Sequence, residues 1–567
     1  MECDVLICGT GLIESILAAA LSWQGTNVLH IDSNNYYGDN CATLTIEQIK
    51  NWFINSKFNK TGFKNYKNIK LSINDTDFNV VSRDYGIDLS PKVLFTKSPL
   101  LDVLIKSRVY HYLEFQSLSD FHTYEDNSFG KLVSSKEDIF TDESLNLLVK
   151  RKLMKFLKFI VDDDYVSKID EHEMGGKLKD FMTKNFKLED KYANELIFTL
   201  GLINNPDINA IDGLAKIRRY LLSLNVYGNF PAMYSKFGGP GEISQGFCRS
   251  AAVAGTVYKL GSKLISYDQE TKLAQLNDGS KVKVNERVIS SLNQVYEKPL
   301  ECKFYEISRM ILIVDKACEE WFNEGESSSI VIFPPGSLDS NNQYPVECLI
   351  MGAGTGCCPQ GKCIWYLHTI APTVNNIAEN DLKCALSNME ESYLRESTFN
   401  YDDFNEVDLK FYNNNKVGLT ESGTEKLSKS LRDFKIRHSN ERINYIMKLE
   451  FTQLTLVDQL VQANKYGYDG IIKKTEHGIL ISNMPSSELS YDGFVEEARK
   501  LYIEIVGDDV DFFDVDFEDE EEEKEQYEFQ LKEREMSLEN GTGSHSSNED
   551  AIMDDTDDQT GDMEFEL

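Results

Sequence analysis

The first residues whose types and spacing suggest a binding site are Gly9 and Gly11, followed by the acidic residue Asp32. Glycines at this spacing let a backbone turn approach a diphosphate. An acid about 20 residues later, at the end of the next strand, can accept a hydrogen bond from a ribose hydroxyl. The pattern is that of a dinucleotide-binding motif and points to FAD or NAD as the group it would hold.

The third glycine of this motif is replaced by Glu14. A carboxylate ~4 Å from a diphosphate costs about 4 kcal/mol at an effective dielectric constant near 20. At ~1.4 kcal/mol per decade, the loss of affinity is roughly a thousandfold. We therefore expect no bound cofactor, and Asp32 then only caps a turn. In the alternative, Glu14 turns into solvent and the site still binds a flavin.

Other reactive residues give weaker signals. Cys357, Cys358 and Cys363 have no second cysteine pair or histidine cluster nearby, as a zinc site would require, so we expect buried thiols and no metal. Neither an H-E-x-x-H array nor a G-x-S-x-G elbow occurs. These absences favour a binding protein over a hydrolase.

A helix predicted over residues 242–254 follows a glycine-rich loop and carries Glu242 and Arg249. Residues seven apart lie on one helical face, about 10.5 Å apart along the axis. An acid and an arginine so placed could bind a polar protein surface. The alternative is a solvated stripe with no partner.

The elements that position these residues form an α/β pattern. A βαβ unit over residues 4–32 holds the glycine motif, and strand and helix signals return after residue 226. Residues 115–225 look mostly helical, with Val149, Leu153, Phe156, Leu157 and Ile160 on one face of a helix and Arg151, Lys155 and Lys158 on the other. The later elements are a hairpin over 273–284 around Asp278-Gly279, a strand over 478–482 and a helix over 493–506.

We therefore predict an α/β, flavoprotein-like domain with an inserted all-helical second domain and a disordered acidic C-terminal tail. The expected divisions are domain I at 1–115 and 226–506, domain II at 116–225, a polar insertion within domain I at 376–445, and the tail at 507–567.

The charge is concentrated at the C-terminus. The chain has a net charge of −34, and residues 508–567 hold 25 acidic and 3 basic residues. Nucleic acid is an unsuitable partner because phosphate binding needs a basic face. We find no run of 18 apolar residues and no signal-peptide pattern, and the eleven cysteines are scattered. A cytoplasmic protein with reduced thiols is expected.

Several segments together resemble the Rab GDP-dissociation inhibitor and Rab escort protein superfamily, also called the choroideraemia protein superfamily. Details at Trp23–Gly25 and Tyr37–Asp39 are most similar to fungal Rab escort proteins. The segments that carry the resemblance are Gly9–Ser15, Asn35–Gly38, Asp88–Lys92, Tyr227–Tyr258, Gln360–Lys362 and residues 478–506.

The resemblance implies a flavoprotein-like domain I without flavin, in which Tyr37, Glu242 and Arg249 belong to a platform for GDP-bound Rab GTPases. Lys259 stands in the same region, where relatives often place methionine. The platform expected here is thus Tyr37, Glu242, Arg249 and Lys259.

The resemblance also implies a non-catalytic escort role, as component A of Rab geranylgeranyltransferase. Such a protein presents newly made Rab to the type II geranylgeranyltransferase α/β heterodimer. It then holds the geranylgeranyl lipid of the product and contacts membranes transiently and peripherally during delivery. Domain II is expected to shelter the lipid and to dock the transferase, with Phe181, Phe186 and Tyr192 as candidates for docking.

Two alternatives stay open. A Rab GDP-dissociation inhibitor recycles prenylated Rab, but members of that group are usually shorter and lack a long acidic tail. A flavin-dependent oxidoreductase would use the βαβ unit and Asp32.

Overall fold

A computed structural model gives the arrangement of most of the chain. It describes residues 1–58, 65–74, 80–125, 127–131, 145–300, 304–371, 377–397, 443–456, 472–483, 487–508 and 510–513. Much of the polar insertion expected at 376–445, and the acidic tail from residue 514 onward, lie outside the described residues.

The predicted βαβ unit is confirmed as β1 (Glu2–Cys8), α1 (Leu12–Trp23) and β2 (Val28–Asp32). β1 and β2 pair in parallel, with Leu6 opposite Leu29. Every residue of β2 is buried, as expected for a strand in a sheet covered on both faces. The sheet runs in the order β11-β2-β1-β14-β13-β12, with β21 beside β14 and β20 beside β21. The bounds are β11 Val257–Leu260, β12 Leu264–Asp268, β13 Leu273–Leu276, β14 Lys281–Ser291, β20 Lys473–Lys474 and β21 Leu480–Ser482.

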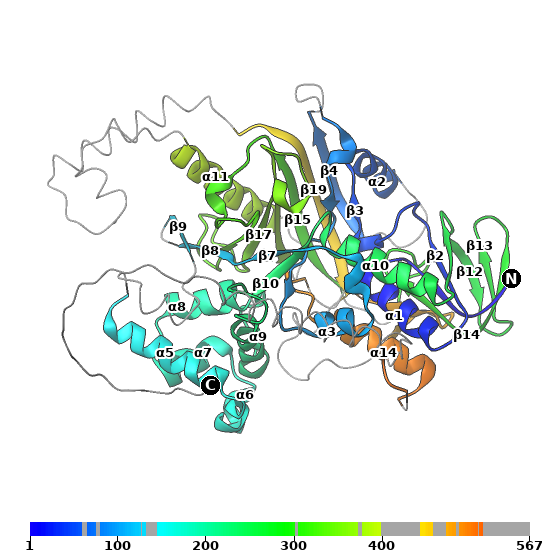
Figure 1. Cartoon of the computed structure of the whole chain (residues 1–567), viewed down its shortest axis with the longest axis horizontal. Helices are drawn as coiled ribbons and strands as arrows, with labels where there is room; N and C mark the ends of the chain where they lie inside the picture. Colours follow the sequence, from blue (N-terminus) through cyan, green and yellow to red (C-terminus); the bar gives the residue numbers. More distant parts are fainter. Residues whose placement is uncertain are drawn as a thin grey trace, which may run out of the picture. The chain divides into compact units, whose positions relative to one another are not determined.

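A second sheet has the order β4-β19-β15-β18-β17-β16-β8-β9 (Figure 1). Its strands are β4 Tyr66–Ile73, β8 Asp120–Glu125, β9 Ser128–Lys131, β15 Phe304–Val314, β16 Ser328–Phe333, β17 Val346–Gly352, β18 Cys363–Ala371 and β19 Tyr445–Leu456. Helix α11 (Ile377–Ser397) packs on this sheet and buries Leu382, Ala385 and Met389. The start of the expected polar insertion therefore contributes to the core.

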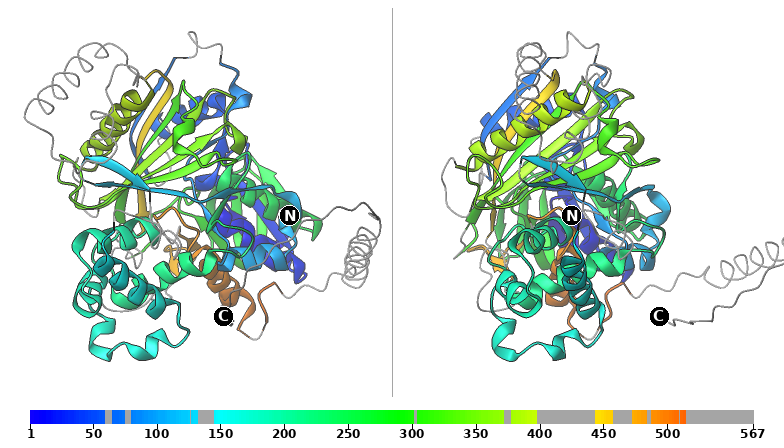
Figure 2. Two further views of the ribbon diagram at one scale, coloured as in Figure 1. Left: turned by 60° about the vertical axis from the view of Figure 1, so that its left-hand side comes forward. Right: turned by 90° about the vertical axis from the view of Figure 1, so that its left-hand side faces the viewer.

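The helical lobe, residues 145–224, consists of short helices packed on one another (Figure 2). The Asn146 side chain caps α5 by accepting a hydrogen bond from Val149 N at 2.9 Å. The predicted apolar face of α5 is confirmed, and its cationic face is exposed. The elements are α5 Leu147–Val161, α6 Glu171–Met174, α7 Leu178–Phe186, α8 Asp190–Asn194, a π-helical turn Glu195–Leu200 and α9 Ala210–Ser223.

The segment 115–131 is not helical, contrary to the sequence prediction. It forms β7 (Phe115–Leu118), β8 and β9, and β8 pairs in parallel with β16. The β-branched and aromatic residues of β8 suit a strand, but only the distant partner β16 makes the strand stable. Among the described residues after position 116, the first helix is α5, so helical structure does not start at the predicted boundary.

The remaining elements connect the two sheets and the lobe. Helix α1 contacts both α10 (Gly239–Val253) and α14 (Phe494–Val506). Among the described residues, no helix is both long and apolar enough to span a membrane. The smaller elements are β3 Thr43–Leu44, α2 Ile46–Phe58, β5 Ile87–Asp88, β6 Leu94–Phe95, α3 Pro99–Lys106, a 3-10 turn Val109–Tyr112 and β10 Ala232–Ser235.

The first residues of the expected acidic tail are ordered, which corrects the boundary predicted at 507. Phe513 is only 3% exposed, and its ring lies 6.1 Å from that of Phe247 in α10. Phe512 lies 5.3 Å from Tyr502 of α14. Aromatic rings bury large apolar areas, so two of them hold this segment despite the neighbouring acids. Residues Met1–Phe513 accordingly form one compact unit.

We expect Phe513→Ala to lower the free energy of unfolding by about 3 kcal/mol, because truncating a buried phenylalanine leaves a cavity. Urea unfolding followed by circular dichroism measures the change. Phe237→Ala, at a phenylalanine that is 51% exposed, is the matched control and should have a much smaller effect. Equal stability of the two variants would contradict the packing of Phe513.

Candidate functional site

The glycine motif forms a tight turn between β1 and α1. Gly9 has a φ of 104°, a conformation that favours glycine, and a Cβ there would lie 2.7 Å from Ser291 Oγ. Gly9 N donates to Ile31 O at 2.8 Å, which ties the turn to β2. The turn therefore has the geometry of a dinucleotide-binding loop.

Asp32, at the end of β2, is fully buried and already has protein donors on both oxygens. Its Oδ2 accepts from Thr10 N at 2.9 Å and from Thr10 Oγ1 at 2.7 Å. Its Oδ1 accepts from Asn34 N at 2.8 Å and from Gln294 Nε2 at 3.1 Å. A ribose hydroxyl would have to displace these donors.

Glu14 folds back over the turn instead of pointing into solvent. It is 4% exposed, and its Oε2 would lie 2.5 Å from a Cβ on Gly11. Its Oε1 accepts a hydrogen bond from Ser482 Oγ at the end of β21. Burial, with the nearby Asp39 carboxyl, raises the pKa of Glu14 to about 8, so the group is mostly protonated at neutral pH.

Asp39 completes a buried group of three carboxyls. It accepts from Ser291 Oγ, and from Gln294 Nε2 at 3.0 Å. Burial and repulsion by Asp39 raise the pKa of Asp32 to about 7, and burial raises the pKa of Asp39 as well. Glu14 and this network fill the diphosphate side and the ribose side of the motif, so the residues present do not fit a dinucleotide.

Asp88, in the segment Asp88–Lys92, holds the beginning of α10. Its Oδ2 accepts from Tyr234 OH at 2.7 Å and from Gly239 N at 3.2 Å, and its Oδ1 accepts from Thr43 Oγ1 at 2.5 Å. Burial raises the pKa of Asp88 to about 6, although these hydrogen bonds oppose the shift. Because Gly239 is the first residue of α10, the carboxyl also lies at the positive end of the helix dipole.

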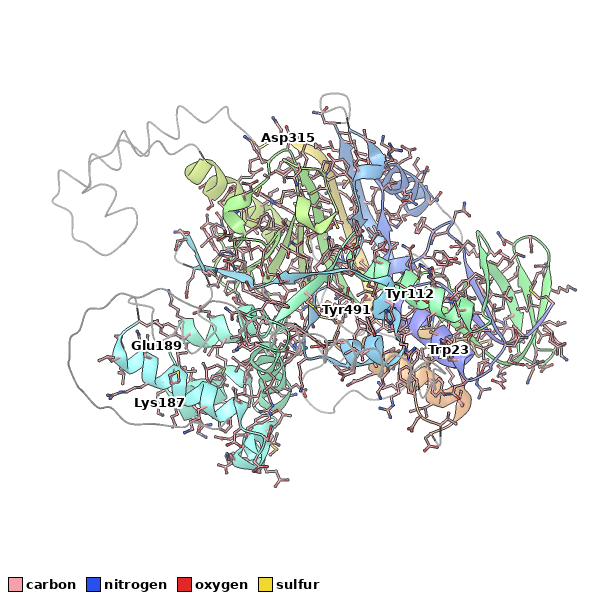
Figure 3. All side chains as sticks on the ribbon, in the orientation of Figure 1. Trp23, Tyr112, Lys187, Glu189, Asp315 and Tyr491 are labelled. Atoms are coloured by element: carbon pink, nitrogen blue, oxygen red, sulfur yellow. The ribbon has the colours of Figure 1, made fainter. Side chains whose placement is uncertain are left out.

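Helix α10 presents Glu242 and Arg249 two turns apart, as the sequence predicts. Glu242 is half-buried in the first turn and accepts from Gln245 Nε2 at 3.3 Å, and burial raises its pKa. Arg249 is exposed, and its Cζ lies 4.5 Å from the ring centre of Tyr112, which Figure 3 labels. The aromatic ring holds the guanidinium in place while leaving it accessible.

Tyr37 and Lys259 lie at the adjoining edge of the first sheet. The Tyr37 ring packs edge-on against Tyr258 of β11, with centroids 5.7 Å apart. Burial, with Cys248 of α10 nearby, raises the pKa of Tyr37. Lys259, also on β11, donates to Asp278 Oδ2 at 2.6 Å, which partly neutralises its charge. The structure thus brings Tyr37 close to α10 and pairs Lys259 with the 277–279 turn.

Sequence reasoning missed the residues that support this region, above all Tyr112 and Tyr258. Tyr112 is far from Arg249 along the chain, so no local spacing connects them. Tyr258 and Lys259 are neighbours on a short strand, so their side chains point to opposite faces of the sheet. This alternation was the one sequence signal that the Tyr258 ring faces inward.

The candidates for transferase docking lie mostly in the core of the helical lobe. Phe181 and Phe186 are each 6% exposed, and their rings are 6.0 Å apart. Phe186 also packs on Phe156 of α5 at 5.2 Å. Their apolar side chains pack within the lobe and leave little exposed surface, and transferase docking at these residues stays a prediction. Tyr192 is half-buried.

The three clustered cysteines are buried, with Cys357 Sγ 3.4 Å from Tyr234 OH. Burial raises the pKa of Cys357 to about 12, so it is a protonated thiol. Among the residues that the structure describes, no three His, Cys, Asp or Glu side chains are placed so that together they could hold a metal ion.

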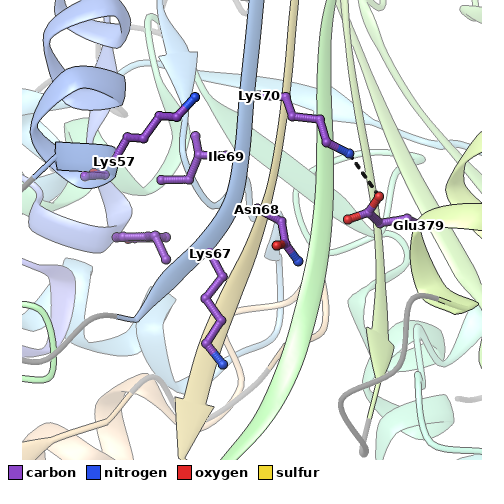
Figure 4. Close-up of a pocket in the computed structure, with 8 residues that line it drawn as sticks. Lys57, Lys67, Asn68, Ile69, Lys70 and Glu379 are labelled. Carbon is purple, nitrogen blue, oxygen red and sulfur yellow. Dashed lines mark hydrogen bonds and ion pairs between the residues drawn. The ribbon is translucent and has the colours of Figure 1, made fainter.

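A hollow of about 610 Å³ beside α2 gives no support to anion binding (Figure 4). Lys70 pairs with Glu379 at 3.1 Å, and Lys67 pairs with Glu306 at 3.4 Å. These carboxylates offset the positive charge that a nucleic-acid site needs. The lining residues are Ser56, Lys57, Tyr66, Lys67, Asn68, Ile69, Lys70 and Glu379.

Comparison with known proteins places this geometry in a family. The sequence model of the family described as GDP dissociation inhibitor matches residues 1–405. The chain belongs to the GDP dissociation inhibitor family. A crystal structure of a Rab GDI from Plasmodium falciparum shares the fold, with a TM-score of 0.62 over 90% of this chain and 99% of that chain, at 18% identity.

Within the GDP dissociation inhibitor family, two yeast proteins resemble nearly the whole chain. One from Saccharomyces cerevisiae, named Rab proteins geranylgeranyltransferase component A, is 47% identical over 528 residues, covering 91% of this chain and 86% of that protein. A Candida albicans protein of the same name is 43% identical over 560 residues, with the same coverage. A Schizosaccharomyces pombe protein named probable secretory pathway GDP dissociation inhibitor 1 is 26% identical, covering 67% of this chain and 82% of that protein.

We expect Glu14→Gln to stabilise this GDP dissociation inhibitor family member in a pH-dependent way. The pKa of Glu14 lies near 4.5 in the unfolded chain and about 8 in the folded one. The wild type therefore loses stability as the pH rises between these values, by up to about 1.4 kcal/mol per pH unit. The gain in Tm of the variant should grow between about pH 5 and about pH 8.

Thermal unfolding at several pH values measures this gain. Glu2→Gln, at an exposed residue paired with Lys283, is the control. A gain that does not change with pH would show that Glu14 is not buried.

Proposed function

We propose that this chain acts as component A of a Rab geranylgeranyltransferase. It binds newly made GDP-bound Rab GTPases and presents them to the type II geranylgeranyltransferase heterodimer, without catalysing the transfer itself. The observation that carries the proposal is the 47% and 43% identity, over 91% of the chain, to two proteins named for that role. The filled dinucleotide motif supports it, because Glu14 and the donors to Asp32 occupy the position where a redox cofactor would bind to this motif.

The proposed Rab-binding platform consists of Tyr37, Glu242, Arg249 and Lys259. Arg249 suits this role because it is exposed and already stacked on Tyr112, so little side-chain entropy is lost on binding. Glu242 lies on the same helical face and offers an acceptor. Lys259 contributes less, since Asp278 already pairs with it.

The helical lobe is proposed to handle the geranylgeranyl lipid and to dock the transferase. A chain of roughly twenty carbons gains up to about 16 kcal/mol on full burial, at ~0.8 kcal/mol per methylene. The lipidated product therefore needs shelter before it reaches a membrane. Phe181 and Phe186 would support the docking surface from within, and Tyr192 is the docking candidate that keeps exposed atoms. Delivery would involve brief peripheral contact of a cytoplasmic protein with the membrane.

The nearest alternative is recycling of prenylated Rab by a GDP-dissociation inhibitor. A relative named for that activity matches less of the chain, at 26% identity over 67%. A flavin-dependent oxidoreductase is disfavoured because Glu14 and the donors to Asp32 occupy the motif.

Reconstitution separates the first two roles. The chain is mixed with unprenylated GDP-bound Rab, the transferase and geranylgeranyl diphosphate, and lipid transfer is followed by mass spectrometry. Component A activity should make transfer depend on the chain. Transfer that proceeds equally without it would reject the escort role and favour recycling.

A charge reversal tests the platform. Arg249→Glu should weaken binding of GDP-bound Rab by at least about tenfold, or ~1.4 kcal/mol, because it replaces an accessible cation by an anion. Titration calorimetry gives the Kd. Arg287→Glu, at an exposed arginine on β14, is the matched control. If both variants bind alike, Arg249 has no role in the platform.

A further inference from the structure

Two cations of the helical lobe end on one short segment of the α/β body. Lys216 of α9 donates to the Glu488 carboxylate and to Asp492 Oδ2, the latter at 3.3 Å. Arg219, one turn further along α9, donates to the same Asp492 oxygen. Glu488 is fully buried. Residues three apart share a helix face, so α9 presents both cations to the segment 487–492.

The same segment is bonded to the body on its other side. Lys92 Nζ donates to Glu488 O, and Val93 N donates to Leu489 O at 2.7 Å. His368 Nε2 of β18 lies 3.0 Å from Ser487 O. The segment 487–492, in which Figure 3 labels Tyr491, therefore connects α9 with the second sheet.

The connection extends to the beginning of α10. Lys92 belongs to the segment Asp88–Lys92, and Asp88 accepts the hydrogen bond from Gly239 N. Hydrogen bonds and the short chain segment Asp88–Lys92 thus connect α9, through Asp492 and Glu488, to the helix that carries Glu242 and Arg249.

Other polar contacts also cross the boundary between lobe and body, namely the partly exposed Lys191–Glu125 pair at 3.2 Å and hydrogen bonds from Asn204 to Ser487 and from Thr96 to Ser223, but much of the remaining boundary is apolar. Tyr220 of α9, for example, packs edge-on against Phe95 and Phe121 of the body. Apolar burial is non-directional and tolerates small rotations of the lobe. A buried ion pair is directional, and removal of one partner costs about 3–5 kcal/mol. The ion pairs are thus the contacts best suited to hold one orientation.

We propose that Glu488 and Asp492 are positioning residues, which hold the helical lobe in one orientation relative to α10 through Lys216 and Arg219. A GTPase bound at α10 then presents its C-terminus to the lobe and to the transferase in a defined geometry. The presentation of the GTPase C-terminus rests on the proposed function, whereas the orientation of the lobe does not.

The orientation can be measured directly in the full-length chain. Spin labels are placed at Lys158→Cys on the exposed face of α5 and at Lys281→Cys on β14, in a background with Cys302→Ser and Cys384→Ser. Asp492→Asn should broaden the distribution of distances between the two labels. Asp492→Glu, which keeps a carboxylate at this position, should leave the distribution narrow. Asp207→Asn removes an exposed ion pair with Lys177 inside the lobe and serves as the control, which should stay narrow.

Arg219→Gln breaks the same pair from the lobe side and should also broaden the distribution. It keeps the test valid if Asp492→Asn folds poorly. Distributions as narrow as the parent's in both variants would overturn the proposal.

The functional consequence has its own readout. In the reconstitution, Asp492→Asn should leave the Kd for GDP-bound Rab unchanged and lower the rate of lipid transfer by about tenfold, a difference of ~1.4 kcal/mol in the barrier. Equal losses of binding and transfer would indicate general destabilisation and contradict a positioning role. If the wild-type chain gives no transfer, the proposed function fails, and the spin-label distances still decide the orientation.

Discussion

The carboxyl group of Glu14 lies in the turn where a cofactor-binding relative of this fold would bring its backbone close to a diphosphate. A buried carboxyl survives there because it is mostly protonated, accepts a hydrogen bond from Ser482, and is held next to Gly11. Asp32 and Asp39 complete the filling by taking donors from the surrounding loops. Hydrogen bonds of these three carboxyl groups now join the ends of β1, β2, β14 and β21.

With the motif filled, the structural role of this region is to hold helix α10 in place. Helix α1, which follows β1 of the first sheet, packs against α10, and Asp88 holds the N-terminus of α10. The first turn of α10 approaches β3 so closely that a Cβ on Gly241 would lie 2.6 Å from Thr43 N. Arg249 and Glu242 are therefore displayed by a helix whose beginning is held by several independent contacts. That rigidity is what a protein-binding surface requires.

Sequence patterns were sufficient wherever the information was local. The βαβ unit, the hairpin around Gly279 and the apolar face of α5 follow from periodicity and turn residues, and all three are present. Prediction failed where long-range contacts decide. Strand β8 is stabilised by pairing with the distant strand β16, and Phe513 is buried by packing against the distant Phe247. The burial of Phe181 and Phe186, the docking candidates, could not be deduced from residue type alone. The ion pairs between α9 and the segment 487–492 join residues more than 270 positions apart, which no spacing rule reaches.

We propose that this chain binds its partner on the surface of α10 and binds no cofactor at the dinucleotide motif. Hydrogen–deuterium exchange of the full-length chain, with either GDP-bound Rab or FAD added, tests it most directly. Rab should slow exchange in the peptides that cover residues 34–38 and 242–253, and FAD should leave exchange in the peptide covering residues 9–15 unchanged. Slowed exchange at 9–15 with FAD, together with no response of α10 to Rab, would contradict the proposal.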